Sequence, residues 1–166
     1  IKSSAASDVY KRQPFKNVYY LNGHATDLEE ECTRYTSLLS QFPTDIVCLG
    51  IGENGHIAFN DPDVANFNDH KLVKIVKLDH VCRQQQVNEK CFETLEQVPT
   101  EALTLTIPAL LKAKWMFCIV PFKNKSQAVY RTIHGDISEK CPASILRRKE
   151  KSSLYLDTES AQLLNL

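Results

Sequence analysis

The chain has 166 residues, 43% of them hydrophobic, which is enough for one domain with a core of its own. Its 20 basic and 20 acidic side chains balance, so it lacks the basic excess of proteins that bind nucleic acid or membrane surfaces. The longest apolar run, Trp115 to Val120, is too short to span a bilayer. The six cysteines form no C-x-x-C pair, and a chain of this size with such a core needs no disulfide framework, which favours a reducing, cytoplasmic compartment.

Residues 1–13 show no apolar period and resemble a translated cloning adapter. We therefore expect a non-native or disordered tail at 1–13, followed by part of a single domain at 14–166. Residues 17–21 predict a short strand. The acidic segment after it predicts a helix in which Thr26 and Glu29 form a capping box.

Residues 45–49 form a continuous apolar run between turn residues, which is typical of an interior parallel strand covered on both faces. Residues 71–78 predict a strand, and residues 80–94 predict a mostly polar helix. The alternation continues with a strand at 102–107, a helix starting at Pro108, a strand at 115–120, a helix at 124–134 ended by Gly135, a strand at 153–156 and a short closing helix capped by Thr158.

Strands and helices alternate along the whole chain after the tail. This pattern predicts the α/β class, as a three-layer α/β/α Rossmann-like sandwich with a mostly parallel sheet and helices on both faces.

A glycine-rich loop, Gly50-x-Gly52-x-x-Gly55, directly follows the strand predicted at 45–49. It matches the dinucleotide-binding pattern, in which the third glycine opens a long helix. Here Pro62 stops any such helix soon after the loop, so we discount a nucleotide-binding oxidoreductase.

The residues after the glycines indicate chemistry of another kind. Open α/β sheets bind ligands at the carboxyl ends of parallel strands, where this loop lies. His56 can move a proton near neutral pH, and Asp61 can orient the ring and stabilise its charged form. Taken singly, His56, Asp61 and Asn54 are also ordinary loop and turn residues. Only the whole string indicates a site.

That string, residues 50–62, resembles the signature of the glucosamine-6-phosphate deaminase/isomerase family. The resemblance extends over about residues 17–164. The further matching segments are Leu21-Asn22-Gly23, Val98-Pro99-Thr100, Lys125-x-x-Ala128, Cys141-Pro142-Ala143-Ser144-Ile145-Leu146 and Leu154-Tyr155-Leu156-Asp157.

The resemblance implies the conversion of glucosamine 6-phosphate to fructose 6-phosphate and ammonia in amino-sugar catabolism, by a homo-oligomer without cofactor or metal. His56 matches the histidine that opens the sugar ring by moving a proton between the anomeric hydroxyl and the ring oxygen. Asp61 matches the acid that holds this histidine. Asn54 stands where the best-known members have aspartate, so an acid–histidine–acid arrangement is not complete in this sequence.

The resemblance also implies residues that bind the substrate. Lys125 matches a lysine that holds the phosphate, and Arg83 is a substitute for a phosphate-contacting arginine of the family. Phe122 stands where many members have glycine. The loop glycines complete the substrate-binding candidates: Gly50, Gly52 and Gly55.

Two family segments have no counterpart in residues 1–16: a Gly-Thr-Pro phosphate loop, and an Asp-Glu-Tyr segment whose aspartate takes the C2 proton. We therefore expect that the N-terminal part of the domain is missing, and that this chain is inactive and only marginally folded by itself.

Two alternatives share the fold. A 6-phosphogluconolactonase-like hydrolase would carry a Ser-Leu-Phe-Pro type of string after the histidine, and Ala58 to Pro62 favours the deaminases instead. A non-catalytic sugar-phosphate sensor stays open because of Asn54 and Asp61.

Overall fold

The computed structural model describes residues 15–165, and the tail predicted at 1–13 lies outside them. None of the described helices has the length and apolar character needed to cross a membrane. In chain order the elements are α2 (Leu28–Gln41), β1 (Ile46–Leu49), β2 (Val73–Lys77), α3 (His80–Asn88), the 3-10 helix η1 (Leu95–Gln97), β3 (Glu101–Leu105), α4 (Ile107–Leu111), β4 (Trp115–Val120), the 3-10 helix η2 (Lys123–Lys125), α5 (Ser126–His134), the 3-10 helix η3 (Pro142–Arg148) and β5 (Ser152–Leu156).

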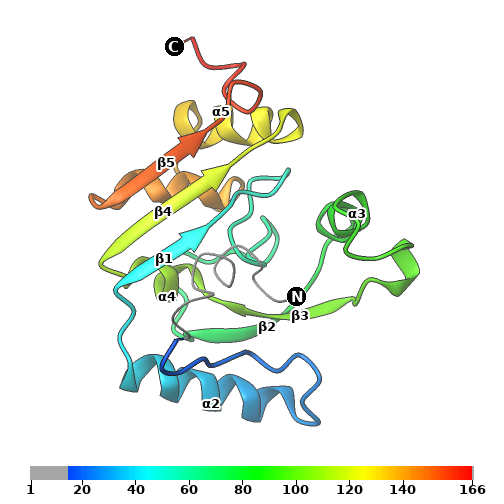
Figure 1. The fold of residues 1–166 in the computed structure, drawn as a ribbon, viewed down its shortest axis with the longest axis vertical. Helices are drawn as coiled ribbons and strands as arrows, with labels where there is room; N and C mark the ends of the chain where they lie inside the picture. The colour runs from blue at the N-terminus through cyan, green and yellow to red at the C-terminus, as the bar shows by residue number, and fades with distance from the viewer. Residues whose placement is uncertain (1–14, 166) are drawn as a thin grey trace.

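A parallel sheet organises the larger part of the molecule, in the strand order β1-β4-β5 (Figure 1). This confirms the α/β class and its parallel sheet. β1 forms one edge of the sheet in the described part of the chain, so the prediction of an interior strand at 45–49 does not hold there. Strands 115–120 and 153–156 are confirmed within one residue.

A second, smaller sheet pairs β2 with β3 in antiparallel fashion, and α2 packs against β2. The strands predicted at 71–78 and 102–107 are therefore present, but they do not extend the parallel sheet. Thr106 follows β3 and caps α4 by accepting a hydrogen bond from the backbone N–H of Ala109. Pro108 occupies the first turn of α4, as predicted.

The core lies on one face of the parallel sheet. Met116, Cys118 and Val120 alternate along β4 and are almost fully buried. In Figure 1 the helical segments of the second half lie behind the strands. They contribute the buried side chains of Ile107, Leu110, Ala128, Val129, Ala143, Ile145 and Leu146.

The opposite face of the sheet is open in the described part of the chain. Ile46 on β1, Ile119 on β4 and Tyr155 on β5 are 55%, 49% and 52% exposed. Trp115 shares this face because its register partner is Ile46. The prediction of helices on both faces is thus met on one face only by residues 15–165.

Within residues 15–165, the segment predicted as a strand at 17–21 pairs with no strand. Its carbonyl groups are taken by side chains of α2 instead. The hydroxyl of Tyr35 donates to the carbonyl of Tyr19 at 3.3 Å, and Arg34 donates to the carbonyl of Tyr20 at 2.9 Å. Residues 17–21 are therefore tied to α2 by side chains, and the strand predicted there is not formed.

Four predicted helix ends differ from the structure. Asp27, and not Thr26, caps α2, because its carboxylate accepts hydrogen bonds from the next backbone N–H groups. α3 ends at Asn88 instead of 94, just before the left-handed residue Lys90 (φ 59°). Thr158 starts no helix, since the residues after Asp157 form turns. The helix predicted at 124–134 starts at 126 and ends before Gly135.

Phe122 has a backbone conformation that side chains rarely adopt. Its φ of 80° and ψ of 145° lie in a region that is populated almost only by glycine. The backbone N–H of Phe122 donates to the carboxylate of Asp157 at 2.9 Å, and its carbonyl accepts from the N–H of Lys125 at 3.1 Å. These bonds hold the strained residue in the turn that leads into α5.

We expect Ile46→Thr to change the free energy of unfolding by no more than about 0.5 kcal/mol and to reduce self-association, because Ile46 lies on the open face and threonine keeps the strand propensity. Ile145→Thr is the matched control, because the same change at a buried site adds an unpaired hydroxyl that costs about 1–3 kcal/mol and also loses packing. Urea unfolding and light scattering measure both effects. Equal losses of stability in the two variants would mean that the open face is covered.

We expect Phe122→Gly to be more stable than Phe122→Ala by about 1 kcal/mol in urea unfolding. Both variants remove an exposed ring, but only glycine relieves the positive φ, and this gain exceeds the entropy that glycine adds to the unfolded chain. An alanine variant as stable as the glycine variant would contradict the strain.

Candidate active site

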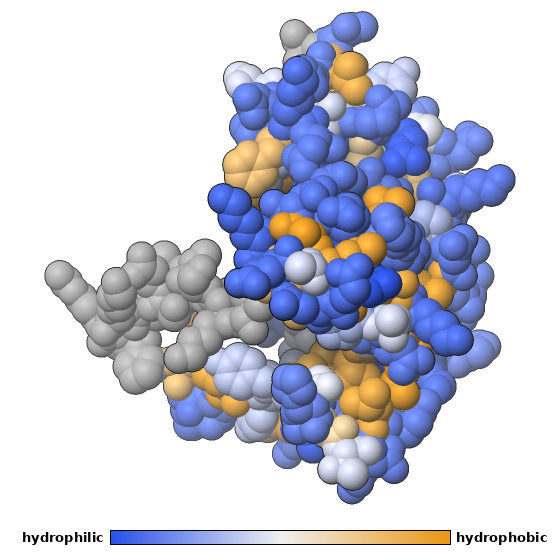
Figure 2. Space-filling view, turned by 90° about the vertical axis from the view of Figure 1, so that its right-hand side faces the viewer, coloured by the Kyte–Doolittle hydropathy of each residue, from blue (hydrophilic) through white to orange (hydrophobic). Residues whose placement is uncertain are grey.

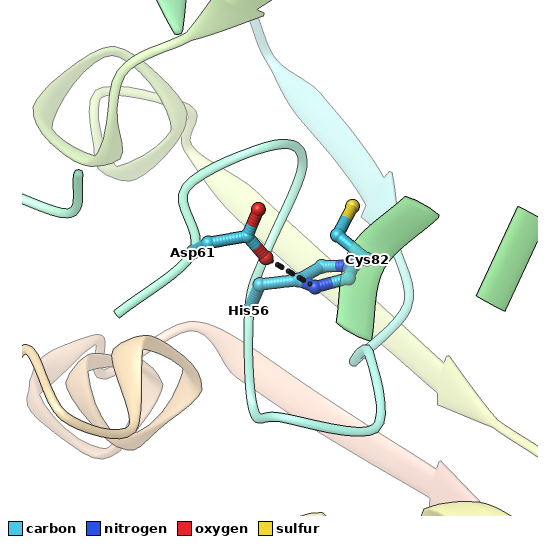
Figure 3. A group of neighbouring side chains, drawn as sticks. All are labelled: His56, Asp61 and Cys82. Carbon is cyan, nitrogen blue, oxygen red and sulfur yellow. Dashed lines mark ion pairs between the residues drawn. The ribbon is translucent and has the colours of Figure 1, made fainter. Parts of the chain in front are cut away.

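The loop after β1 carries the catalytic candidates and folds back on itself. The backbone N–H of Gly52 donates to the carbonyl of His56 at 2.9 Å, and that of Gly55 donates to the carbonyl of Gly52 at 2.9 Å. Ile57 and Asn60 then form a short bridge that reverses the chain. As a result His56 and Asp61 face each other from one loop, as Figure 3 shows.

Two glycines of the loop are required by close contacts. A β-carbon on Gly52 would lie 2.1–2.4 Å from three atoms of the His56 ring, so the ring occupies the space that any larger residue would need. Gly55 has a φ of +93°, and a β-carbon there would lie 2.8 Å from the sulfur of Cys141. The glycines therefore set the orientation of His56 and the packing of the loop against the segment before η3.

The antiparallel sheet of β2 and β3 contacts the loop through hydrogen bonds with β3. The buried amide of Asn60 donates to the carbonyl groups of Ile57 and Leu105, at 3.0 and 2.9 Å. The hydroxyl of Thr104 accepts from the backbone N–H of Phe59 at 3.0 Å. β3 therefore supports the turn that precedes Asp61.

Asp61 is a buried acid in contact with the candidate histidine. It is 1% exposed, and its Oδ1 lies 2.8 Å from Nδ1 of His56. Burial raises the pKa of Asp61, but the contacts from His56 and Asn54 outweigh it and hold that pKa below its ordinary value. Asp61 is thus an ionised acid that favours the N–H on Nδ1, which leaves Nε2 of the ring for a substrate.

The His56–Asp61 contact is short but not aligned as a hydrogen bond, since Nδ1 has no well-directed acceptor among the described residues. Catalytic hydrogen bonds often have this geometry before substrate binds and tighten in the complex. The orientation of Asp61 therefore matters for the orientation of the ring.

Asn54 is the third catalytic candidate, and it contacts both partners. Its side-chain amide donates to Oδ1 of Asp61 at 2.9 Å, and its oxygen accepts from the backbone N–H of His56 at 3.0 Å. The string at residues 50–62 and its family resemblance grouped these three residues, and the structure brings them together.

Cys82, on the first turn of α3, lies beside the pair in Figure 3. Its sulfur and one ligand atom each from His56 and Asp61 lie within 4.8 Å of one another, an arrangement that could hold a metal ion. Burial and the charges of Asp61 and Asp79 raise the pKa of Cys82 to about 12. The thiol is therefore protonated, whereas a metal ligand would be the thiolate.

A cavity of about 380 Å³ opens beside the loop at the carboxyl end of β1, and its lining includes Gly50, Gly52, His56 and Lys125. Gly55 does not line it. Lys125 is only 6% exposed, and its Nζ lies 3.2 Å from a carboxylate oxygen of Glu89.

The molecular surface on this side is suited to a polar ligand. Figure 2 turns the molecule so that the side toward which the strands point in Figure 1 faces the viewer. Hydrophilic residues cover most of that surface, and hydrophobic residues form separate patches between them.

α3 contributes a wall of the cavity that was not predicted from the sequence. Gln85 accepts a hydrogen bond from the backbone N–H of Glu53 at 3.2 Å and donates to Glu89 at 2.7 Å. Cys82, Gln85 and Glu89 are spaced by three and four residues and so share one face of the helix. The spacing of these three side chains, in a helix predicted as mostly polar, was the sequence signal that could have indicated a cavity wall.

Arg83 is placed elsewhere. Its guanidinium donates to the carbonyl groups of Leu95 and Val98, at 2.6 and 3.0 Å, and it does not line the cavity. These bonds fasten the η1 turn to α3, because both carbonyl groups flank that turn. In this structure Arg83 therefore lies outside the lining of the cavity, and its role toward a substrate stays a prediction.

Comparison with known proteins places the chain in a family. A family model described as glucosamine-6-phosphate isomerases/6-phosphogluconolactonase matches residues 2–155. A glucosamine-6-phosphate deaminase of Bacillus cereus is 42% identical over 155 residues, which cover 93% of this chain and 57% of the relative. One of Listeria monocytogenes is 39% identical, with 94% and 64% covered.

Solved structures agree with this assignment. A monomeric glucosamine-6-phosphate deaminase matches with a TM-score of 0.81 and 38% identity, over 87% of this chain and 58% of that one. A 6-phosphogluconolactonase from Thermotoga maritima matches with a TM-score of 0.62 and 20% identity, over 86% and 56%, which shows a common fold.

This chain spans about three-fifths of the length of these curated relatives, which are longer. The family model nevertheless covers most of the chain, and the geometry around His56 lies inside the matched residues. The chain therefore belongs to the glucosamine-6-phosphate isomerase/6-phosphogluconolactonase family.

Proposed function

We propose that this chain is part of a glucosamine-6-phosphate deaminase, which converts glucosamine 6-phosphate and water to fructose 6-phosphate and ammonia. The observation that carries the proposal is the common cavity. His56, oriented by the ionised Asp61, and the buried cation of Lys125 line the same space of about 380 Å³. A sugar phosphate needs a proton carrier at one end and a cation at the other.

In this proposal His56 opens the sugar ring. Nε2 takes the proton of the anomeric hydroxyl and returns it to the ring oxygen, whose bond to C1 breaks. Asp61 keeps Nδ1 protonated and stabilises the imidazolium that forms between the two transfers. Gly52 allows the ring to lie flat against the loop, within reach of the cavity.

Lys125 holds the phosphate group. Its charge is poorly hydrated because the side chain is only 7% exposed, and Glu89 neutralises it in the structure. Glu89 is 44% exposed and can turn to solvent when a phosphate takes its place. A buried cation with an exchangeable counter-ion is suited to an anionic ligand.

The later steps need a carboxylate base that takes the C2 proton, because the C2–H group is a weak carbon acid. The family supplies it from an Asp-Glu-Tyr segment, which residues 15–165 lack. We therefore propose that this chain alone opens the ring but releases no ammonia, and that the whole enzyme adds the base.

The lactonase alternative is less well supported, since the solved lactonases are only distantly similar and the curated relatives are named deaminases. A sensor without catalysis would not need the ionised Asp61 beside His56. We propose a cytoplasmic location because all six cysteines are free. The homo-oligomer stays a prediction, and one related deaminase is described as monomeric.

We expect the chain to accelerate the exchange between the α and β anomers of glucosamine 6-phosphate, because this exchange needs only ring opening and closing. His56→Gln should lower the catalysed rate by roughly 10²-fold, in keeping with the loss of a general acid–base. Exchange NMR spectroscopy measures the rate. In the whole enzyme the same change should lower ammonia release by a similar factor.

His134→Gln is the matched control, because His134 is exposed on α5 outside the cavity. It should leave anomer exchange unchanged. A folded His56→Gln variant that exchanges anomers as fast as the parent would show that His56 is not the ring-opening residue.

We expect Lys125→Ala to weaken binding of fructose 6-phosphate by roughly 10- to 100-fold, because a charge-assisted hydrogen bond is worth about 1.5–3 kcal/mol. Lys123→Ala is the control, since Lys123 is exposed in the same turn. Isothermal titration calorimetry compares the two. Equal affinities would leave Lys125 as a structural partner of Glu89 alone.

A further inference from the structure

The amide of Asn54 lies between two carboxylates. Its Nδ2 is 2.9 Å from Oδ1 of Asp61 and 3.1 Å from Oδ2 of Asp79. Its Oδ1 accepts from the backbone N–H of His56 at 3.0 Å. Only one orientation of the amide fits these partners, because the other would place an oxygen against two anions and an NH₂ group against an N–H.

Asp79 is itself held rigidly by the start of α3. It is the N-cap of that helix, and its Oδ1 accepts from the backbone N–H of Cys82 at 2.6 Å. Its second oxygen is the one that Asn54 contacts. The cap therefore fixes the carboxylate, and the carboxylate fixes the amide that contacts Asp61.

Asp61 depends on this support. Its Oδ1 is in contact with both Asn54 and His56, while its buried Oδ2 has no well-directed hydrogen bond among the described residues, although the nearby Cys82 thiol also helps to lower the pKa of Asp61. A carboxylate held by one oxygen can rotate unless the partner of that oxygen is fixed. The side chain of Asn54 is fixed because its Nδ2 donates to Asp61 and Asp79 and its Oδ1 accepts from the N–H of His56.

We propose that Asp79, acting through Asn54, is a positioning residue that sets the orientation of Asp61 and thereby of the His56 ring. The inference rests on the proposed ring-opening function. Asp79 does not touch the substrate cavity, so its effect reaches the reaction only through the amide.

The pairing also explains why an amide at position 54 fits this chain. An aspartate there would place a third carboxylate next to Asp61 and Asp79, at distances where like charges strongly disfavour ionisation. Asn54 instead offers one N–H to each acid. The second acid of the site is thus Asp79, which follows β2 in the chain and reaches His56 only through Asn54.

The first test replaces the acid and keeps the helix cap. Asp79→Asn retains an N-cap residue, but its single amide oxygen can accept from either the N–H of Cys82 or the amide of Asn54, and not from both. Asp27→Asn is the matched control, since Asp27 caps α2 in the same way and lies outside the cavity. ¹⁵N NMR of the imidazole reports which nitrogen of His56 carries the proton, and exchange NMR reports ring opening.

We expect the parent and Asp27→Asn to show His56 protonated on Nδ1, with equal anomer exchange. Asp79→Asn should show a mixture of the two tautomers and at least about tenfold slower exchange at saturating substrate, since small misplacements of a catalytic group are costly. Substrate affinity should stay the same, because Lys125 is untouched. An unchanged tautomer and rate in a folded Asp79→Asn variant would overturn the proposal.

A charge exchange provides the second test. Asn54→Asp by itself should slow anomer exchange, because three carboxylates then crowd together. Adding Asp79→Asn should restore part of the rate, although the same change slows the parent. A double variant slower than Asn54→Asp alone would overturn the proposal. The NMR measurement of the His56 tautomer needs no turnover, so it tests the positioning role by itself. The ring-opening function is tested separately: normal anomer exchange in His56→Gln would show that this function is wrong.

Discussion

The burial of the charge on Asp61 is the constraint on which the site depends. An ionised acid that is 1% exposed loses most of its hydration, and the loss is large unless donors replace water. The amide of Asn54 supplies a donor, and Nδ1 of His56 lies 2.8 Å from the same carboxylate oxygen, both in the same loop. The loop therefore has to reverse twice between β1 and Asp61. Its glycines and the bridge between Ile57 and Asn60 make these reversals possible.

Distant parts of the chain keep the loop in this shape. β3 supports it from below through Thr104 and the carbonyl of Leu105. The segment before η3 closes it from the side, since Cys141 packs where a β-carbon on Gly55 would lie, and the N–H of Ala143 donates to the Gly55 carbonyl at 2.9 Å. The loop that holds His56 and Asp61 is about a dozen residues long, but contacts from as far along the chain as Ala143 stabilise it.

Much of this could be predicted from local patterns, and the failures have physical causes. The parallel strands after the loop follow from short apolar runs, and the site follows from the string around His56. The strand predicted at 17–21 was wrong, and two of its carbonyl groups accept instead from Arg34 and Tyr35 of α2, which strand propensity alone does not reveal. The apolar residues of strand 45–49 do not by themselves show whether both faces of the strand are buried, because burial depends on which other segments pack against it.

The positions of Arg83 and Glu89 show a second limit. Both lie on α3, and their charges alone favour Arg83 as the residue facing an anion. The helix phase decides otherwise. Gln85 and Glu89 share the face toward the loop, while Arg83 turns to the carbonyl groups flanking η1. Without the contacts that set this phase, the pattern of a polar helix does not reveal which face lines the cavity.

The two ends of α3 differ in how firmly they are held, and this difference determines how the cavity can respond to a ligand. At its start, Asp79 is both helix cap and partner of Asn54, so a shift of the helix along its axis would break the network that orients Asp61. At its end, Glu89 is 44% exposed and contacts Lys125 through a flexible side chain. In the proposed function, exchange of Glu89 for a phosphate requires its carboxylate to leave both Lys125 and the amide of Gln85, which donates to it at 2.7 Å, while the contacts at the start of α3 need not change. The proposed proton-transfer pair can therefore keep its geometry while the proposed anion site changes its occupant.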